Sequence, residues 1–282
     1  MPAEQILCGN GAADLIFRLV WAKKPSRALV TAPTFAEYAT ALESIGCTVE
    51  RFFLREQEDF AVTDAFCAAI RPGVDVVFLC QPNNPTGQLT ALPLVEQILH
   101  RCAACGTLLV VDECFLDFLP DHALHTAKGL LGEGDLVILK AFTKLYGMAG
   151  VRLGYALSAD TALLEQMQTC GQPWGVSSLA QAAGLAALEE TAYVEKVRAL
   201  IAEQRPRLTA GLRALGLRVL DGGANYLLFQ APETLGEALR QRGAVLRSCA
   251  NYPGLGPGWY RTAVRTGPEN EQLLKLLAEV LE

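Results

Sequence analysis

Five short apolar runs alternate with longer stretches of helical periodicity over the first two-thirds of the chain. Most of these runs are rich in leucine or β-branched residues, and they are apolar throughout rather than at every second position. A strand with this pattern is covered on both of its faces, as in a largely parallel sheet between helices. The alternation therefore predicts an α/β fold with a mostly parallel sheet flanked by helices. The predicted strands cover residues 28–31, 76–80, 107–111, 136–139 and 153–157, and helices are predicted at 91–105 and 161–170.

The character of the sequence changes from about residue 186. A long helical stretch with charged and apolar residues covers 193–215, and Pro206 is expected to kink or split it because proline lacks a backbone N–H. The elements after it are two strand-like segments and a terminal helix, at 218–220, 226–229 and 269–281. We therefore expect a large domain over residues 1–190 and a smaller α+β domain over residues 191–282.

The composition restricts the partners and the location of the protein. A formal net charge of -6 and a pI near 5.3 argue against nucleic acid and anionic membranes, so a few placed arginines must bind any anionic ligand. No apolar run reaches the ~20 residues of a membrane span, and the N-terminus lacks a signal-peptide pattern. The nine cysteines suit a reducing cytoplasm, and the pair Cys102 and Cys105 lacks the further ligands of a metal site. We expect a cytoplasmic protein without a metal.

Four polar clusters fall at or near the ends of predicted strands. Taken singly, each has an ordinary explanation as a turn, a helix cap or a surface lysine. Ligands of open α/β sheets, however, bind at the carboxyl ends of the strands, so these clusters are expected to meet in one site. The clusters are Gln81-Pro82-Asn83-Asn84-Pro85-Thr86-Gly87, Asp112-Glu113, Lys140-Ala141-Phe142-Thr143-Lys144 and Gly150-Val151-Arg152-Leu153-Gly154.

In order and spacing the clusters resemble the motifs of the class I and II aminotransferase superfamily, which are pyridoxal 5′-phosphate (PLP) enzymes of fold type I. The resemblance covers essentially the whole chain. It implies the PLP-transferase type I fold, PLP as cofactor and a homodimer. The matching motifs are Asn-Asn-Pro-Thr-Gly at 83–87, Asp-Glu-x-Phe-x-Asp-Phe at 112–118 and Phe-Thr-Lys-x-x-x-Met-Ala-Gly-x-Arg-x-Gly at 142–154.

The resemblance also implies a role for each motif residue. Lys144 would bind the cofactor covalently and, once displaced by substrate, transfer protons. Asp112 would pair with the pyridinium nitrogen and keep it protonated, and Asn84 would donate a hydrogen bond to the phenolate oxygen. The other expected cofactor contacts are ring stacking by Phe35 and phosphate binding by Gly11, Ala12, Ala13, Thr143 and Arg152.

Three arginines near the C-terminus resemble substrate-binding positions. Arg261 matches the arginine that binds the substrate α-carboxylate. Arg247 matches the position that binds the substrate phosphate in histidinol-phosphate aminotransferase and its relatives. Arg265 stands where glycine is frequent and would add a third cationic contact. The expected substrate is therefore a phosphorylated amino acid.

Within the superfamily, the likeness is greatest to the threonine-phosphate decarboxylases of cobalamin biosynthesis. It rests on Phe115 in place of the usual tyrosine, on Gly9-Asn10-Gly11, and on Val264-Arg265-Thr266 followed by Glu269-Asn270. The implied reaction is decarboxylation of L-threonine O-3-phosphate to 1-aminopropan-2-ol O-phosphate.

Two alternatives stay open. The first is that the chain is a histidinol-phosphate aminotransferase or transaminates a related amino acid, because these enzymes share nearly all of these motifs. A truncated, inactive relative is the other alternative, because family members usually have several dozen more residues, the N-terminal arm, before the phosphate loop. In addition, Ala141 stands where a phosphate-binding serine is usual.

Overall fold

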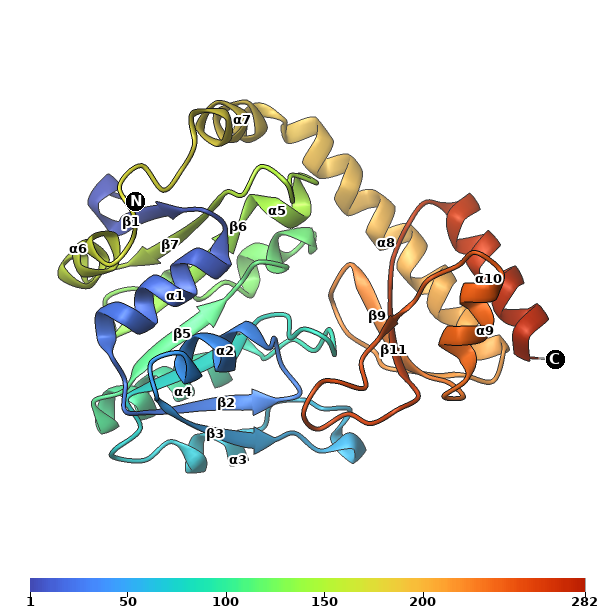
Figure 1. The fold of residues 1–282 in the computed structure, drawn as a ribbon, viewed down its shortest axis with the longest axis horizontal. Helices are drawn as coiled ribbons and strands as arrows, with labels where there is room; N and C mark the ends of the chain where they lie inside the picture. The colour runs from blue at the N-terminus through green and yellow to red at the C-terminus, as the bar shows by residue number, and fades with distance from the viewer. Residues whose placement is uncertain (282) are drawn as a thin grey trace.

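Seven strands form the larger of two sheets in the computed structural model, which describes residues 1–281 (Figure 1). Their order is β1-β7-β6-β5-β4-β2-β3. Strands β2 to β6 pair in parallel, whereas β7 is antiparallel to both β6 and β1. The mostly parallel sheet that the sequence predicts is therefore confirmed. The strands are β1 (Ile6–Gly9), β2 (Arg27–Ala32), β3 (Thr48–Phe53), β4 (Val76–Cys80), β5 (Leu108–Asp112), β6 (Leu136–Ala141) and β7 (Gly154–Ser158).

Helices cover both faces of this sheet. Helices α1, α2 and α6 pack with one core on the first face, and α3 and α4 pack with a second core on the other face. Within β4, Val76 and Phe78 contribute to the first core and Val77 and Leu79 to the second. Both sides of the strand are buried, which explains why it is apolar throughout. The helices of this lobe are α1 (Ala12–Lys23), α2 (Glu37–Glu43), α3 (Asp64–Ala69), α4 (Leu92–Cys105), α5 (Phe142–Leu145), α6 (Thr161–Thr169) and α7 (Ser178–Glu189).

The smaller lobe contains a four-stranded antiparallel sheet in the order β10-β11-β9-β8. Helix α8 runs from α7 of the large lobe into this second lobe, beside α10 (Figure 1). The predicted α+β character of this part of the chain is confirmed. The division into two domains at residue 190 stays a prediction, and α8 begins at the next residue. The elements of the second lobe are α8 (Thr191–Ala214), β8 (Arg218–Val219), β9 (Tyr226–Gln230), α9 (Leu235–Gln241), β10 (Arg247–Ser248), β11 (Trp259–Ala263) and α10 (Gly267–Leu281).

Helix α8 continues through Pro206, so of the two expected effects of the proline, a kink or a split, the split does not occur. Residues on both sides of the proline, Ile201 and Leu208, are buried in the same core as Leu277 of α10. Tertiary packing on both sides thus keeps the segment helical despite the lost backbone hydrogen bond. Within residues 1–281, no helix is both long and apolar enough to cross a membrane.

Candidate active site

A cavity of about 110 Å³ lies at the carboxyl ends of the central strands of the large sheet. Strand β5 contributes Asp112 to its wall, and the short helix α5 after β6 contributes Thr143 and Lys144. The parallel strands bring these distant motifs to one edge of the sheet, as the sequence predicts. The residues that line the cavity are Ala12, Ala13, Phe35, Cys80, Asn84, Asp112, Cys114, Phe115, Ala141, Thr143, Lys144 and Arg152.

The N-terminus of α1 forms one wall of this cavity. Gly11 is the residue before the helix, and its φ of 85° is a conformation that favours glycine. A Cβ atom at Gly11 would also lie only 2.6 Å from Nη2 of Arg152. The unpaired backbone N–H groups of the first helical turn and the guanidinium of Arg152 therefore come together, an arrangement that suits a phosphate. Thr143, which has a hydroxyl, also lines the cavity, whereas Ala141 offers none.

The carboxylate of Asp112 is only 5% exposed and is held by two donors. The backbone N–H of Cys114 donates to Oδ1 over 3.0 Å, and the hydroxyl of Tyr38 donates to Oδ2 over 2.5 Å. Burial and then the charge of Asp112 raise the pKa of Tyr38 well above its ordinary value, so the hydroxyl keeps its proton. Sequence reasoning missed Tyr38, because an aromatic residue in a helix usually belongs to the core.

Lys144 lies in the short helix α5 and is exposed to solvent at the cavity. Its ammonium group is 5.4 Å from the ring centroid of Phe115. The lysine can therefore approach a ligand without first breaking an ion pair, since none is found for it within residues 1–281.

A buried ion-pair cluster lies next to this lysine in sequence. Nζ of Lys140 is 3.0 Å from Oε2 of Glu113 and 2.8 Å from Oδ1 of Asp117. Burial alone would lower the pKa of Lys140, but the two carboxylates outweigh it and raise that pKa above the ordinary lysine value. The cluster joins the turn after β5 to strand β6, which leads directly into α5.

A second cavity of about 330 Å³ adjoins the first and shares Phe115 and Lys144 with it. The three predicted substrate arginines, Arg247, Arg261 and Arg265, all line this second cavity. Thus the structure brings the predicted cofactor residues and the predicted substrate residues into two connected spaces.

The arginines of the second cavity differ in their contacts. Arg247 and Arg261 are direct partners across the antiparallel strands β10 and β11, so their side chains lie on the same face of the small sheet. Arg261 donates to Oδ1 of Asn84, and its guanidinium lies 5.0 Å from the ring of Tyr226. Arg265 is exposed and pairs with Glu269 over 3.0 Å. Arg261 therefore connects the two cavities, whereas Arg265 lies at the edge.

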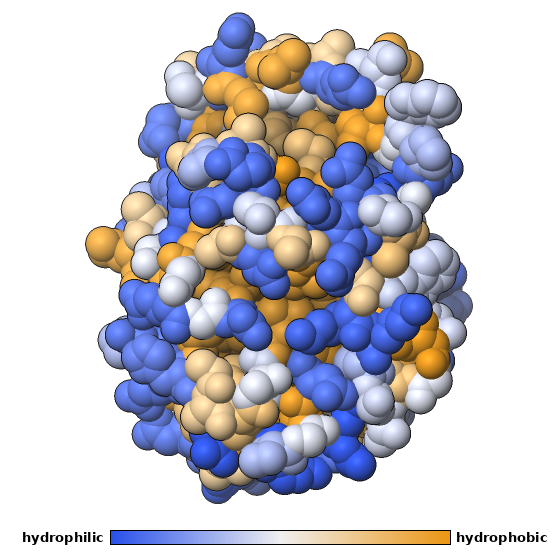
Figure 2. All heavy atoms as spheres, turned by 90° about the vertical axis from the view of Figure 1, so that its left-hand side faces the viewer, coloured by the Kyte–Doolittle hydropathy of each residue, from blue (hydrophilic) through white to orange (hydrophobic). Residues whose placement is uncertain are grey.

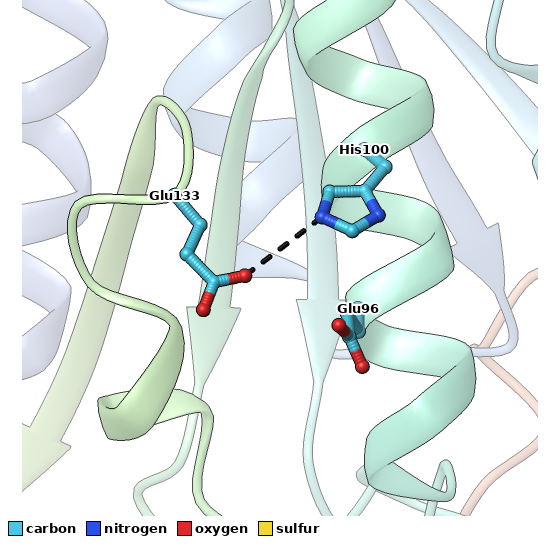
Figure 3. A group of neighbouring side chains, drawn as sticks. All are labelled: Glu96, His100 and Glu133. Carbon is cyan, nitrogen blue, oxygen red and sulfur yellow. Dashed lines mark ion pairs between the residues drawn. The ribbon is translucent and has the colours of Figure 1, made fainter.

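Another polar group lies outside both cavities. Glu96 and His100 on α4 and Glu133 in the loop before β6 have their ligand atoms within 4.8 Å of one another (Figure 3). All three side chains are exposed, and Nε2 of His100 lies 3.8 Å from Oε2 of Glu133. Exposed pairs of this kind are common and weak. We interpret the group as a surface ion pair rather than a metal centre.

Comparison with known proteins gives the family. The sequence profile of aminotransferase class I and II matches residues 1–280. Over the full chain, the protein is 39% identical to the threonine-phosphate decarboxylase of Salmonella typhimurium and covers 78% of that relative. It is 36% identical to the histidinol-phosphate aminotransferase of Symbiobacterium thermophilum, again over the full chain and 77% of the relative. The chain therefore belongs to the class I and II aminotransferase family.

A solved structure supports the same conclusion. The histidinol-phosphate aminotransferase from Clostridium acetobutylicum superposes with a TM-score of 0.91 at 26% identity, over 98% of this chain and 84% of that one. The predicted PLP-transferase type I fold is confirmed, and the protein is a PLP-dependent enzyme.

The residues of the first cavity fit PLP. Arg152 approaches the α1 N-terminus so closely that only glycine fits at position 11, and this arrangement suits the phosphate. The buried carboxylate of Asp112 suits a protonated ring nitrogen. Phe35 offers an aromatic face, and Lys144 offers an amine that would bind the cofactor aldehyde. The roles of the individual residues stay predictions, which the experiments below test.

Proposed function

We propose that this enzyme decarboxylates L-threonine O-3-phosphate to 1-aminopropan-2-ol O-phosphate, a step of cobalamin biosynthesis. The observation that carries this proposal is the pairing of Arg247 directly opposite Arg261 at the second cavity. Like charges placed directly opposite each other on a sheet are destabilising. A substrate with both a carboxylate and a phosphate would neutralise both arginines, and the relative that is 39% identical is a threonine-phosphate decarboxylase.

Each residue of the site would have a separate role in this reaction. Bound PLP supplies an electron sink for the pair left by the broken Cα bond. Arg261 would hold the substrate carboxylate, Arg247 would hold the phosphate, and Asp112 would keep the ring nitrogen charged. After CO2 leaves, Lys144 would deliver a proton to Cα, so that a C–H bond replaces the C–C bond. Phe115, beside Lys144, offers no hydroxyl that competes for this proton.

Transamination of histidinol phosphate is the second candidate. It is favoured by the 36% identity to the aminotransferase of Symbiobacterium thermophilum and by the superposition on the enzyme from Clostridium acetobutylicum. Histidinol phosphate has a phosphate but no carboxylate. This substrate would therefore engage Arg247 and leave Arg261 without an anionic partner in its half-reaction, whereas 2-oxoglutarate would supply a carboxylate in the other.

Product analysis separates the two reactions. The purified protein with PLP is incubated with L-threonine O-3-phosphate alone, and with histidinol phosphate plus 2-oxoglutarate. We expect CO2 and 1-aminopropan-2-ol O-phosphate from the first mixture, in equal amounts and without a keto acid. Formation of glutamate in the second mixture, with no CO2 in the first, would contradict the proposal.

We also infer that two copies of the chain form a homodimer in the cytoplasm. Helix α7 exposes three leucines, Leu179, Leu185 and Leu188, which are 82%, 70% and 60% accessible. The side of the molecule at the left of Figure 1 also exposes apolar surface near its centre (Figure 2). Exposed apolar surface of this kind marks interaction sites. The nine free cysteines support a reducing location.

A further inference from the structure

Tyr38 of α2 is a buried tyrosine that contacts the cofactor cavity from behind. The residue is 0% exposed, and its ring stacks on Phe78 with a centroid distance of 4.8 Å and an interplanar angle of 16°. Its hydroxyl donates to Oδ2 of Asp112 over 2.5 Å. Tyr38 has no role in the proposed reaction itself.

Tyr38 touches two residues that line the cavity, at two different points. The hydroxyl binds Asp112, the predicted partner of the ring nitrogen. The ring packs edge to face with Phe35, the predicted stacking residue, with a centroid distance of 5.5 Å and an angle of 82°. A shift of Tyr38 would therefore move both the charge at the edge of the cofactor ring and the aromatic group on its face.

The hydrogen bond from Tyr38 to Asp112 also stabilises the negative charge of the carboxylate. The other oxygen, Oδ1, accepts from the backbone of Cys114, which the main chain holds in place. The contact to Oδ2 comes from the Tyr38 side chain, so it can be removed by substitution. Hydrogen bonds to charged groups are stronger than those between neutral groups, and burial strengthens them further.

We propose that Tyr38 is a positioning residue for the cofactor: its hydroxyl fixes the orientation and charge of the Asp112 carboxylate, and its ring edge supports Phe35. The inference rests on the proposed role of Asp112 and holds for decarboxylation and transamination alike. Its failure is thus distinguishable from failure of the proposed reaction, because cofactor binding is measured without substrate.

The first test is Tyr38→Phe, which keeps the ring contacts and removes only the hydroxyl. We expect the dissociation constant for PLP to rise about 10- to 100-fold, the range for a hydrogen bond to a charged group. The absorbance maximum of the bound cofactor should shift as well. Tyr260→Phe is the matched control, because the Tyr260 hydroxyl binds the backbone carbonyl of Glu233 in the small lobe over 2.7 Å. An unchanged dissociation constant in Tyr38→Phe would overturn the proposal.

The second test asks whether Tyr38 acts through Asp112. In an Asp112→Ala background, Tyr38→Phe should have no further effect on PLP binding. An equal loss in both backgrounds would show that the Tyr38 hydroxyl does not act through Asp112 and would overturn the proposal. Thermal unfolding of the cofactor-free variants measures any loss of stability separately.

A measurement on the unmodified residue avoids the risk that Tyr38→Phe does not fold. In protein labelled with ¹³C at the tyrosine ζ carbons, the signal of Tyr38 is identified by its shift in Asp112→Asn. We expect PLP to move this signal and to leave that of Tyr260 in place. A Tyr38 signal that does not respond to PLP would contradict the inference.

Discussion

The two cavities of the site differ in the charged side chains that line them. Asp112 provides a buried negative charge in the first cavity, where the ring nitrogen is predicted to bind, and Arg152 provides a positive charge at the predicted phosphate end. The second cavity contains arginines, where the substrate is expected to carry anionic groups. Lys144 belongs to both spaces, so it lies where cofactor and substrate would meet.

Arg247 allows a test of substrate recognition at the scale of a single residue. Arg247→Lys keeps the positive charge but loses the planar fork that binds a phosphate through two hydrogen bonds. We expect kcat/KM for L-threonine O-3-phosphate to fall about 10- to 100-fold, mainly through KM, while PLP binding is unchanged. Arg242→Lys, an exposed change outside the cavity, is the control. Equal kinetics for Arg247→Lys and the wild type would show that Arg247 does not bind the phosphate.

Sequence reasoning finds residues that belong to distinctive local patterns and misses those that act through tertiary contacts. Lys144, Asp112 and Asn84 stand in motifs whose order and spacing carry the information. Tyr38 has no such signal, because its partner Asp112 is 74 residues away and the packing of α2 on the sheet brings them together. The link between Asn84 and Arg261, 177 residues apart, was equally beyond prediction.

At the scale of elements, a buried ion cluster ties together the two segments that carry the chemistry. Lys140 near the end of β6 contacts Glu113, which directly follows β5, and Asp117 in the turn beyond it. Glu113 is fully buried and also accepts a hydrogen bond from the backbone of Ala127 over 2.7 Å. The cluster therefore fixes the turn that follows Asp112 relative to the strand that leads to α5.

Removal of Lys140 should destabilise the fold. Lys140→Met leaves Glu113 as a buried charge without its cation, which costs about 3–5 kcal/mol. The raised pKa of Lys140 means that its contribution is complete below the ordinary lysine pKa and is lost only as the pH rises through the raised value. Urea unfolding at pH 7 and pH 9 should therefore give the same loss. Lys196→Met, on the exposed face of α8, should change stability by no more than about 0.5 kcal/mol. A similar small change for Lys140→Met would contradict this account.

The sequence predicts the central strands more accurately than the edge of the sheet. The buried central strands were found within two residues of their ends, because a continuous apolar run marks a strand covered on both faces. The edge strand β3 was missed, since it is only half buried and includes Glu50 and Arg51. The antiparallel direction of β7 was not predictable either, because strand direction depends on pairing rather than on local composition.

At the scale of the whole molecule, the site depends on both lobes. The large sheet supplies the first cavity, and the small sheet supplies the arginines of the second. Oδ1 of Asn84 accepts a hydrogen bond from Arg261 across the boundary between the lobes. The relative position of the lobes therefore determines the distance between the cofactor site and the substrate site.

The proposed homodimer is also a property of the whole molecule. Leu185→Glu places a charge on the exposed apolar face of α7, where a partner would have to bury it. Sedimentation at micromolar concentration should give a dimer for the wild type and a monomer for this variant. Glu189→Gln, at the end of the same helix, is the control and should remain dimeric. A monomeric wild type would show that no stable homodimer forms.

The most direct test of the central claim is a spectroscopic titration of the purified protein with PLP. The claim is that Lys144, at the junction of the two cavities, binds the cofactor covalently. Wild-type protein should develop the visible absorbance of lysine-bound PLP at one equivalent, and borohydride reduction should leave the cofactor attached to the peptide that contains Lys144. Lys144→Ala should bind PLP without this absorbance and without covalent attachment. The same absorbance in Lys144→Ala, or attachment at another lysine, would contradict the account.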